Sequence, residues 1–494
     1  MSGKVAVRSA MTDFWQTHSD KDVTNKSMML DSNADELTKT EVPEIMSYLP
    51  SVAGKDLIEL GAGIGRYTRV LAESAKSVVS VDFMEKFVEK NRKDNSHFGN
   101  VEFICADVTK LKLPSNSADI LFSNWLLMYL DDEEVRGLIG TCIGWLREGG
   151  YMFCRESCFR PSGNIPRGQN PTKYRDPALY DALFRSVVVQ EAGRSYGLEL
   201  VLSKSVDTYI KKKNNNAQVV WLLQKVRRQE GDNKGFATFQ EFLDSQQYSR
   251  NSILRYEKIF GRTFVSTGGL ETTEEFVDML NLKENERVLD VGCGIGGSAF
   301  YMEKKFGCYV VAIDLSSNMI SLGLERAREV GSKKVQFEVA DATKRDYAPE
   351  EFDVIYSRDT ILHIEDKLSL FKKFYSLLKP GGRLMISDYC CGEKEHTAAF
   401  KEYVKQRGYF LISPAQYGKE LETAGFVNVR AEDRSEQFID VLKRELVKFE
   451  KMKDEFISEF SVEDYNYIEN GWREKIERVT AQDQKWGLFY AEKP

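Results

Sequence analysis

The chain repeats itself once over a domain-sized distance, and this duplication constrains its fold more than any other feature of the sequence. The matched segments are ELGAGIGR (59–66) with DVGCGIGG (290–297), VVSVDF (78–83) with VVAIDL (310–315), CADVT (105–109) with VADAT (339–343), ADILFSNWLLMYL (118–130) with FDVIYSRDTILHI (352–364), REGG (147–150) with KPGG (379–382), and AQVVWLLQKV (217–226) with KWGLFYAEKP (485–494). They follow one another in the same order, and most of them have a nearly constant offset. We therefore predict two copies of one domain.

Each copy alternates short apolar segments with amphipathic ones, which predicts an α/β fold with a Rossmann-like, doubly wound and mostly parallel sheet. In the second copy we expect strands at 287–292, 309–315, 335–341 and 352–357, a helix at 298–306, a helical tail around 436–478 and a last strand at 486–491. The polar segment RRQEGDNKG favours a linker at 227–235. The predicted domains are 1–226 and 236–494.

Composition excludes several classes of protein. The 69 basic residues are outnumbered by 76 acidic ones, which argues against nucleic acid or an anionic membrane as the main partner. No apolar run approaches the roughly 18–20 residues of a membrane-spanning helix, and no apolar leader opens the chain. Eight cysteines without a C-x-x-C pair and four histidines argue against a zinc or disulfide framework. We expect a cytoplasmic, monomeric protein without a metal ion.

A glycine-rich turn follows the first strand of each copy, and such a turn is typical of nucleotide binding because glycine lets the backbone bend sharply and approach a ligand. The glycines are Gly61 and Gly63 in the first copy and Gly292 and Gly294 in the second. Asp82 and Asp314 end the next strand, where a carboxylate can accept from both ribose hydroxyls. The second copy also satisfies G-x-G-x-x-G, so a dinucleotide dehydrogenase remains an alternative on this pattern alone.

Three features favour a different cofactor. Arg66 stands where the third dinucleotide glycine would be in the first copy. Glu59 and Asp290 precede the glycines, where a carboxylate would repel a pyrophosphate but suits a sulfonium amino acid. Asp107 and Asp341 end the third strand, placed to accept from an adenine amino group. Together these motifs resemble the class I S-adenosylmethionine-dependent methyltransferases, which implies S-adenosylmethionine as cofactor and S-adenosylhomocysteine as product.

The second copy carries a group of residues that suits a phosphate monoester. SRDTILHI (357–364) places Arg358 and His363 at the carboxyl end of a strand. If the nearby segment EYVKQRGY (402–409) is helical, Tyr403 and Arg407 share one helix face, with Tyr409 just beyond it. Arginine and tyrosine donate well to phosphate oxygens. A solvated helix face stays an open alternative for Arg407.

Longer motifs carry a closer resemblance. The segments are QQY (246–248), VSTGGL (265–270), SRDTILH (357–363) and KQRGY (405–409). With the two-domain layout they resemble the tandem, plant-type phosphoethanolamine N-methyltransferases over nearly the whole chain. The resemblance implies methylation of phosphoethanolamine through mono- and dimethyl intermediates to phosphocholine, feeding phosphatidylcholine and choline synthesis. It implies the first step for domain 1 and the next two for domain 2.

The resemblance also implies roles for individual residues. The catalytic pair falls on Tyr248 and His363, and chemistry supports it, because a histidine oriented by a tyrosine can take the proton of the substrate amine. The implied phosphobase contacts of domain 2 are Gln247, Tyr248, Tyr389, Tyr403, Arg407, Tyr409 and Lys475. The implied cofactor contacts are Gly61, Gly63, Arg66, Asp82, Asp107, Val108 and Asn124 in domain 1, and Tyr256, Ser266, Gly292, Gly294, Asp314, Asp341, Ala342 and Arg358 in domain 2. Arg358 stands where it can serve either ligand.

Domain 1 departs from the pattern of domain 2. Asn124 and Tyr129 stand at the positions of Arg358 and His363, and no Q-Q-Y precedes them. A loop rich in glycine, proline and basic residues offers a different phosphate site. Its expected substrate contacts are Ser157, Ser162, Gly163, Arg167 and Tyr174. A plain surface loop is the alternative, and His18 is a candidate base for this domain.

Two other functions remain open on the sequence alone. One is a tandem methyltransferase for a lipid or another small acceptor, although the tyrosine and arginine clusters and the polar loop do not suggest an apolar entrance. The other is a single active domain beside a regulatory, cofactor-binding copy. The substitutions at Asn124 and Tyr129 motivate the second alternative, and the intact acids Asp82 and Asp107 oppose it.

Overall fold

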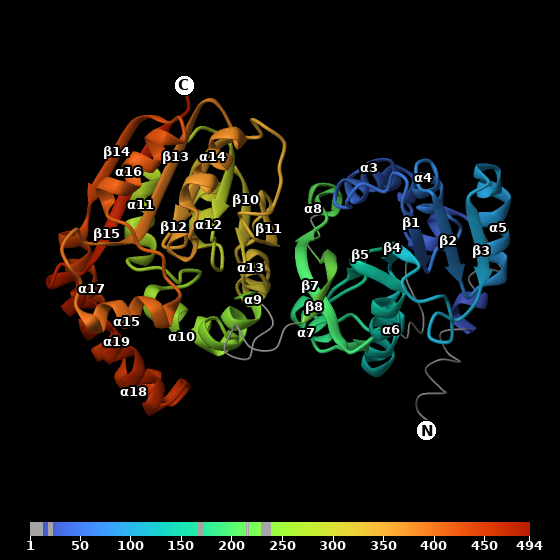
Figure 1. Ribbon diagram of the computed structural model, residues 1–494, viewed down its shortest axis with the longest axis horizontal. Coiled ribbons are helices and arrows are strands. Elements are labelled where there is room, and N and C mark those ends of the chain that lie inside the picture. Colours follow the sequence, from blue (N-terminus) through green and yellow to red (C-terminus); the bar gives the residue numbers. More distant parts are fainter. Residues whose placement is uncertain (1–12, 18–22, 166–171, 214, 216, 229–238) are drawn as a thin grey trace. The chain divides into compact units, whose positions relative to one another are not determined.

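The computed structural model describes residues 13–17, 23–165, 172–213, 215, 217–228 and 239–494. The chain divides into two compact units, unit 1 at Met1–Phe239 and unit 2 at Gln240–Pro494 (Figure 1). Strand β8 (Gln218–Arg228) includes the first two positions of the predicted linker, and the rest of it, 229–235, lies outside the described residues. The linker and the domain boundaries therefore stay predictions.

The sheet of unit 1 has the strand order β7-β8-β5-β4-β1-β2-β3. Strands β3, β2, β1, β4 and β5 are parallel, whereas β8 is antiparallel to both of its neighbours. The other strands are β1 (Asp56–Leu60), β2 (Ser77–Asp82), β3 (Val101–Cys105), β4 (Ala118–Asn124), β5 (Leu146–Ser157), β6 (Val189–Glu191) and β7 (Arg194–Ser205). The helices are α2 (Asn25–Met29), α3 (Ala34–Ser47), α4 (Thr68–Ala72), α5 (Glu85–Asn95), α6 (Asp132–Trp145), α7 (Pro177–Arg185) and α8 (Asp207–Lys213), with short 3₁₀ turns η1 (Ser96–Phe98) and η2 (Leu127–Tyr129).

Helices cover both faces of this sheet, because successive residues of a strand point to opposite sides. Leu57 of β1 lies in a core with α3, α4 and α8, whereas its neighbour Ile58 lies in a second core with α6 and α7. Strand β4 reads ADILFSN and buries side chains on both faces, as a central parallel strand must. Two-sided burial holds the strand ends, and the residues that follow them, at fixed positions.

Unit 2 repeats this architecture with the strand order β14-β15-β13-β12-β9-β10-β11. Its strands are β9 (Arg287–Val291), β10 (Tyr309–Asp314), β11 (Val335–Ala340), β12 (Phe352–Arg358), β13 (Leu378–Cys391), β14 (Val427–Asp433) and β15 (Gln484–Glu492). Its helices are α9 (Phe239–Phe242), α10 (Arg250–Phe260), α11 (Gly269–Asp278), α12 (Gly297–Phe306), α13 (Ser317–Val330), α14 (Lys367–Leu377), α15 (Ala398–Arg407), α16 (Pro414–Thr423), α17 (Ser435–Lys451), α18 (Lys453–Glu459) and α19 (Val462–Thr480), with the π turn η3 (Leu243–Gln247) and the 3₁₀ turn η4 (Ile361–His363). The predicted fold class, strands, helix and helical tail are confirmed. Strand β15 is antiparallel to β13 as β8 is to β5, which also confirms the last match of the duplication.

The strand order predicts which edge of each sheet binds a ligand. The order reverses between β1 and β4 in unit 1 and between β9 and β12 in unit 2, and open α/β sheets bind ligands beyond the carboxyl ends of such strands. The glycine turns follow β1 and β9. The segments SNWLLMYL and SRDTILHI begin in the last residues of β4 and β12 and run beyond them. Both motifs of each copy therefore meet at one sheet edge.

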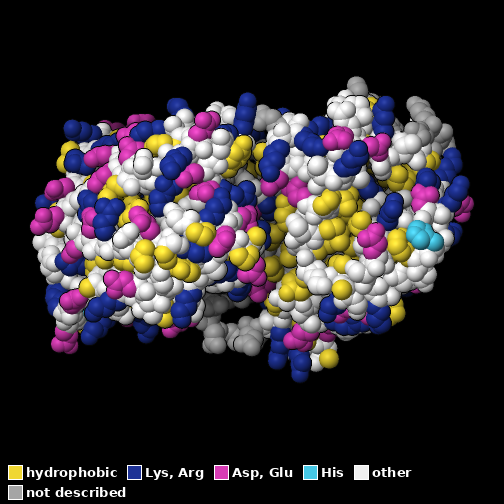
Figure 2. Space-filling model, turned by 90° about the horizontal axis from the view of Figure 1, so that it is seen from above, with side chains coloured by type: hydrophobic (Ala, Val, Ile, Leu, Met, Phe, Trp, Pro, Cys, Tyr) yellow, Lys and Arg dark blue, Asp and Glu magenta, His cyan; other side chains and the backbone are white. Residues whose placement is uncertain are grey.

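Charged side chains of both signs are interspersed over the face shown in Figure 2. The helices that the structure describes include none that is both long enough and apolar enough to cross a membrane.

Candidate active sites

The glycine turn of unit 2 is shaped by backbone conformations that other residues rarely adopt. Gly292 and Gly294 have φ of +74° and +56°. A Cβ on Gly294 would lie 2.7 Å from a methyl carbon of Val265, so a larger residue does not fit without displacement. The Gly294 N–H donates to the Asp314 carboxylate at 3.0 Å, and the Ser316 N–H donates to its other oxygen at 2.8 Å. Asp314 therefore fixes the turn while standing at the end of β10.

Unit 1 builds the same arrangement. Gly63 has φ of +55°, and its N–H donates to the Asp82 carboxylate at 2.8 Å. The Met84 N–H donates to the second carboxylate oxygen at 2.9 Å. Burial raises the pKa of Asp82 to about 6 and that of Asp314 to about 7. Each carboxylate is thus withdrawn from water at the point where ribose hydroxyls could donate to it.

The acids that precede the glycines differ between the units. Asp290 is 1% exposed, and its Oδ2 has no hydrogen-bond partner among the described residues. Burial raises the pKa of Asp290 to about 8. In unit 1 the Glu59 carboxylate instead accepts from the hydroxyls of Thr68 and Ser80, inside the fold. The carboxylate proposed to attract a cationic cofactor group is therefore available in unit 2 and already hydrogen-bonded in unit 1.

The acids after the third strand adopt one geometry in both units. Asp107 accepts from the N–H and hydroxyl of Thr109 at 2.9 and 2.8 Å. Asp341 accepts from the N–H and hydroxyl of Thr343 at 2.9 and 2.6 Å. Both side chains stay partly exposed, next to the buried Val108 and the half-buried Ala342. Of the other predicted cofactor contacts in unit 2, Tyr256 stacks on Phe260 and Ser266 accepts from the Gly269 N–H through its carbonyl at 3.0 Å.

The structure brings together the predicted catalytic and phosphobase residues of unit 2. His363, on η4, lies edge-on to Tyr409 with ring centroids 5.1 Å apart, and Tyr409 lies edge-on to Tyr403 at 5.9 Å. The Arg407 guanidinium lies 5.9 Å from the Tyr403 ring centroid. These four side chains are half-buried, so a small ligand can reach them. The spacing of EYVKQRGY and the ending of α15 at Arg407 are as predicted.

Two further cations face this cluster from α19. The Lys475 Nζ donates to the Tyr389 hydroxyl at 3.2 Å, and burial lowers the pKa of Lys475 to about 8. The Arg478 guanidinium lies 3.8 Å from the Tyr403 ring centroid, a contact that the sequence interpretation missed. Because α19 is remote in sequence from α15, no local pattern connects Arg478 with Tyr403. The cluster offers positive charge and hydroxyl donors to one anionic ligand.

Tyr248 lies near both Asp314, at the end of β10, and Arg407, at the end of α15. Burial raises its pKa, and the charges of Asp314, Arg407 and Asp359 all act on the hydroxyl. Its neighbour Gln247 ends η3 and is half-buried. Burial, with the charges of Lys367 and Arg407, lowers the pKa of His363 to about 4. The imidazole is therefore neutral at pH 7, the state in which it can accept a proton.

Asp359 belongs to the same site and was missed. It has φ of +49°, a strained conformation for a residue other than glycine. One carboxylate oxygen accepts from the Trp486 indole at 2.9 Å, and the other is buried without a partner among the described residues. Burial raises the pKa of Asp359. The signal was present in the sequence, because Asp359 stands between Arg358 and His363 at the end of a predicted strand.

Arg358 lies beneath the site. It is 4% exposed, and its terminal nitrogens donate to the Gly269 carbonyl at 3.2 Å, to the Thr267 carbonyl and to the hydroxyls of Thr272 and Thr273. These bonds attach the start of α11 to β12. Contact of Arg358 with cofactor or substrate stays a prediction.

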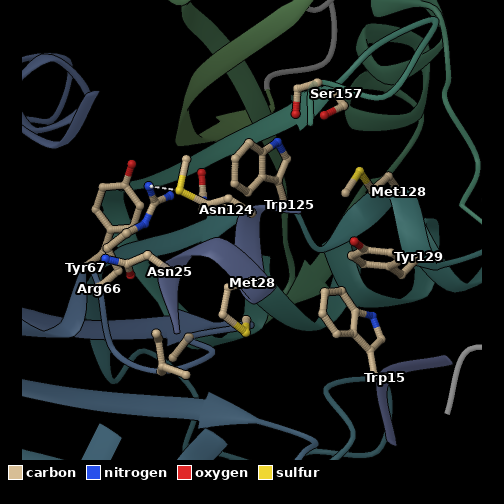
Figure 3. A pocket seen from close by; sticks show the side chains of 14 residues that line it. Trp15, Asn25, Met28, Arg66, Tyr67, Asn124, Trp125, Met128, Tyr129 and Ser157 are labelled. Atoms are coloured by element: carbon tan, nitrogen blue, oxygen red, sulfur yellow. Dashed lines mark hydrogen bonds between the residues drawn. The ribbon is translucent and has the colours of Figure 1, made fainter. Parts of the chain in front are cut away.

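Unit 1 has a pocket at the equivalent sheet edge (Figure 3). It is lined by Trp15, Asn25, Met28, Met29, Ala62, Ile64, Arg66, Tyr67, Asn124, Trp125, Met128, Tyr129, Ser157 and Ser162. Tyr129 and Trp15 lie edge-on at one end, with ring centroids 5.6 Å apart, and Arg66 and Tyr67 lie at the other. Met28 covers the glycine turn, since its Cε lies 2.6 Å from the place of a Cβ on Gly63. Predicted residues from the glycine turn and from SNWLLMYL therefore share one cavity.

The predicted substrate loop of unit 1 is only partly brought to this pocket. Ser157 and Ser162 line it. Gly163 packs against the backbone of Leu30, and Tyr174 is half-buried but does not line the pocket. Arg167 and the candidate base His18 lie outside the described residues. Phosphate binding by this loop stays a prediction.

A buried ionic network lies behind the pocket of unit 1. The Glu41 carboxylate, fully buried, lies 2.6 Å from both Arg66 and Arg155. Burial raises the pKa of Glu41, but the two guanidinium groups outweigh that effect and hold it below its usual range. Arg155 also donates to Asn124 at 3.0 Å and lies 3.7 Å from the Trp125 ring centroid. Asn124 and Arg66 thus have partners within the fold as well as a place in the pocket wall.

The arginine that holds the preceding helix lies on different, neighbouring strands in the two units. Asn124 pairs in register with Arg155 in unit 1, and Arg358 pairs with Ser387 in unit 2, so the arginine that holds the preceding helix comes from the adjacent strand. The next residue along the chain, Trp125 in unit 1 and Asp359 in unit 2, shows a second difference of this kind. Trp125 donates from its indole to Gln218 of β8 at 2.9 Å, whereas in unit 2 the indole belongs to Trp486 of β15 and the acceptor to Asp359.

These features define a class. The donor set fits a sulfonium nucleoside, because two carboxylates per unit stand where ribose and adenine would lie, and Asp290 retains a buried oxygen without a partner among the described residues. Among the described residues, no group of three or more His, Cys, Asp or Glu side chains is arranged to hold a metal ion. Methyltransferase-domain models match residues 58–154 and 282–425. The chain is a tandem class I S-adenosylmethionine-dependent methyltransferase.

Known relatives narrow the class to a family. The chain is 52% identical over 489 residues to phosphoethanolamine N-methyltransferase 1 of Arabidopsis thaliana, covering 98% of both chains, and 51% identical to that of Zea mays, covering 98% and 96%. A solved structure of Haemonchus contortus phosphoethanolamine N-methyltransferase 2, in complex with phosphomonomethylethanolamine and S-adenosylhomocysteine, superposes with a TM-score of 0.77 at 26% identity, covering 93% of this chain and 99% of that one. The chain belongs to the phosphoethanolamine N-methyltransferase family.

Proposed function

We propose that the chain methylates phosphoethanolamine through mono- and dimethyl intermediates to phosphocholine, with the first step in unit 1 and the next two in unit 2. The product would feed phosphatidylcholine and choline synthesis. One observation carries the proposal: Arg407, Tyr403, Tyr409 and Lys475 converge with His363 in a half-buried cluster. A phosphate monoester joined to an amine by a short linker matches such a cluster, because charge and hydroxyl donors lie beside a neutral base.

The phosphate end of the substrate would be held by charge. Arg407 and Arg478 face the ring of Tyr403 from two helices, and Lys475 contacts Tyr389. Hydrogen bonds from cationic groups contribute about 1.5–3 kcal/mol each, roughly twice the contribution of neutral ones. The hydroxyls of the surrounding tyrosines add neutral donors. Unphosphorylated amines lack these contacts, which selects the phosphobase.

The amine end would be prepared by His363 and Tyr248. A secondary or tertiary amine with a pKa of about 10 is mostly protonated at pH 7, so forming its neutral state costs about 4 kcal/mol. His363 is neutral and can accept the proton at its ring nitrogen. The Tyr248 hydroxyl stays protonated because burial raises its pKa, so it can donate to or orient the amine and the imidazole. S-adenosylmethionine, when bound, supplies an electrophilic methyl group.

Each unit would hold its own cofactor with its own acids. Asp82 and Asp107 serve unit 1, and Asp314 and Asp341 serve unit 2. Unit 1 carries Tyr129 at the place of His363 and a pocket lined by Trp15 and Trp125. This difference supports a division of the methylation steps, since aromatic faces attract an ammonium group by about 0.5–2 kcal/mol.

Two finer expectations belong with this proposal. We propose that the enzyme acts in the cytoplasm, because its substrates are small and water-soluble, and that it is a monomer, because the proposed residues of each site come from a single unit. Size-exclusion chromatography with light scattering tests the second expectation. A mass near the 56.5 kDa of one chain supports it.

The decisive experiment measures product distribution with the full chain. The unsubstituted enzyme, given phosphoethanolamine and S-adenosylmethionine, should form mono-, di- and trimethylated phosphobases by mass spectrometry. His363→Ala should accumulate the monomethyl product and bind cofactor normally, because the first step belongs to unit 1. Formation of phosphocholine by His363→Ala at the normal rate would overturn the assignment of the later steps to unit 2.

A further inference from the structure

The turn that follows β4 in unit 1 and β12 in unit 2 is held at its N–H groups by a buried acid. In unit 1 the Glu156 carboxylate, 0% exposed, accepts from the N–H groups of Leu126, Leu127 and Met128 at 3.1, 2.7 and 3.2 Å. In unit 2 the acid is Asp388, also 0% exposed, which accepts from the Leu362 N–H at 3.2 Å. The two acids occupy equivalent places, one residue after Arg155 and Ser387, which pair with Asn124 and Arg358.

The carbonyl side of the turn is held in unit 2 by a buried cation. Lys367 is 3% exposed, and its Nζ donates to the carbonyls of Ile361, Ile364 and Phe410 at 3.1, 2.6 and 2.7 Å. The Phe410 N–H donates to the Leu362 carbonyl at 2.7 Å. Lys367 therefore joins the turn that ends at His363 to the segment that follows Tyr409.

Unit 1 reaches the same result with a different residue. Arg175, 2% exposed, donates to the carbonyls of Leu127 and Leu130 at 2.9 and 2.5 Å. These carbonyls are the counterparts of those of Ile361 and Ile364 in the duplicated segment. Arg175 precedes α7, whereas Lys367 begins α14, so the two cations are not counterparts in the duplication. The charge arrangement around the turn is the same although the residue that supplies the cation is not.

Burying an ionised group costs free energy unless nearby charges or hydrogen bonds compensate for the lost water. Burial raises the pKa of Glu156 to about 7, and the charge of Arg175 offsets part of that shift. Burial raises the pKa of Asp388 and lowers that of Lys367, and each opposite charge offsets part of the other's shift. Arg175 forms its ion pair with Asp132, at 2.9 Å, and buried charges contribute little net stability compared with apolar packing. The clear geometric effect of the buried acids and cations here is to hold the N–H and carbonyl groups of the turn.

We propose that Lys367 with Asp388, and Arg175 with Glu156, are positioning residues that fix the turn presenting His363 in unit 2 and Tyr129 in unit 1 to the amine of the substrate. The inference rests on the proposed function in assigning the turn to the amine. Neither cation touches the ligand cluster directly. A displacement of about 1 Å at a reacting group can lower the rate about a hundredfold, which sets the scale of the expected effect.

The first test substitutes Lys367 in the full chain. Lys367→Met should lower kcat for phosphomonomethylethanolamine about 10- to 100-fold, with the cofactor Kd unchanged, and Lys367→Arg should restore part of the loss. The matched control is Lys493→Met, because Lys493 is a buried lysine of the same unit whose Nζ donates to the Leu378 carbonyl at 2.8 Å, away from the turn. If Lys367→Met and Lys493→Met lose the same factor in kcat and the same amount of thermal stability, then Lys367 only stabilises the fold.

The second test measures the titration of His363 by NMR and needs no substrate. The side chains that act on or contact His363 are Lys367 of α14, Arg407 of α15 and Tyr409 of the following segment, and Asp388 of β13 holds the N–H of the residue before His363. Removing the positive charge of Lys367 should raise the pKa of His363, so its titration should move upward in Lys367→Met and stay in place in Lys493→Met. If Lys367→Met does not fold, Asp388→Ala, which removes the acceptor of the Leu362 N–H, should still lower kcat. Unchanged kcat and an unchanged titration overturn the proposal.

Unit 1 offers an independent arm. Arg175→Met should lower the rate of phosphoethanolamine methylation at least tenfold and leave the methylation of phosphomonomethylethanolamine unchanged. Its matched control is Lys225→Met, because the Lys225 Nζ is buried on the Leu146 carbonyl at 2.8 Å and on Glu191. If the unsubstituted enzyme methylates neither acceptor, the proposed function fails, while the NMR titration still tests whether the charge of Lys367 acts on His363.

Discussion

At the scale of one residue, His363 shows how burial and nearby charges shift the pKa of an imidazole. Burial and the charges of Lys367 and Arg407 lower its pKa to about 4, well below the ordinary value near 6.5. A phosphate dianion bound at Arg407 would offset part of this positive charge. Substrate binding should therefore raise the basicity of the imidazole at the moment when the amine arrives. The imidazole would therefore stay neutral in the empty site and become more basic only when the substrate is bound.

The first prediction follows from this electrostatic argument. In the free enzyme the imidazole signal of His363 should titrate near pH 4, and it should move upward when inorganic phosphate, which carries no ammonium group, is added at saturation. NMR of the imidazole signals measures this, and His363→Asn assigns the signal among the four histidines of the chain. A titration near 6.5 without ligand, or no change on adding phosphate, contradicts this prediction.

The second prediction concerns Arg407. Arg407→Ala removes a charge-assisted contact worth roughly 1.5–3 kcal/mol, so the apparent affinity for phosphomonomethylethanolamine should fall about 10- to 100-fold. Any weak activity on free monomethylethanolamine should barely change, because that amine has no phosphate. Steady-state kinetics on both acceptors gives the comparison. The control is Lys401→Ala, an exposed residue of the same helix, which should behave as the unsubstituted enzyme. Equal losses on both acceptors would assign Arg407 to the fold or the cofactor.

At the scale of elements, arginines attach the helix before the glycine turn to the sheet in both units. In unit 1, Glu41 of α3 binds Arg155 of β5, and in unit 2, Thr273 of α11 binds Arg358 of β12. The cation therefore occupies one place in the fold but comes from neighbouring strands. A cross-strand pair can exchange its members without moving the backbone, because the two side chains share one space.

The third prediction belongs to this helix. Glu41→Gln leaves two buried guanidinium groups without a compensating charge, so we expect unit 1 to lose about 3–5 kcal/mol of stability. Amide hydrogen exchange read separately over β1, β4 and β5 measures the loss, at about tenfold in protection for each 1.4 kcal/mol. Glu36→Gln on the exposed side of the same helix should change stability by about 0.5 kcal/mol or less. Similar small effects of both substitutions would show that the network contributes no stability.

At the scale of the whole molecule, the duplication gives two sites that differ in chemistry. Both units have a glycine turn closed by an aspartate and a third-strand acid. They differ at the acceptor side, where unit 1 presents Trp125 and Tyr129, and unit 2 presents Asp359 and His363. The two units therefore share the acids at the glycine turn and differ in the residues proposed to meet the amine.

The fourth prediction separates the two sites. Asp82→Ala should stop only the first methylation, and Asp314→Ala only the later ones, with product analysis as the measurement.

Binding of S-adenosylhomocysteine, measured by calorimetry, should also depend on pH, because ribose hydroxyls donate best to an ionised carboxylate. Affinity should be full above the pKa of the free carboxyl and fall by up to tenfold per unit below it. In Asp82→Ala the fall should begin near pH 7, the value for Asp314, and in Asp314→Ala near pH 6, the value for Asp82.

Loss of both activities in either variant would contradict two independent sites. A common pH dependence in both variants would contradict the different burial of the two carboxylates.

The sequence alone was enough for the duplication, the doubly wound sheets and the acids that close the glycine turns. These features depend on short-range order: apolar periodicity predicts strands, glycine permits the turn, and residues at the ends of consecutive parallel strands must meet at one edge. Local helix spacing was also enough for Tyr403 and Arg407, since residues four apart share a face.

Only the tertiary structure decided which partners the buried charged residues take. Arg358 ends a strand as expected, but packing directs its guanidinium to the start of α11. Lys367 and Arg175 hold the same turn from unrelated positions, and Arg478 reaches Tyr403 from a distant helix. The energies of these contacts depend on burial and on groups far apart in the chain, which no local pattern encodes. Backbone order follows from the sequence over short distances, whereas the partners of buried charges follow from the packing of the whole unit.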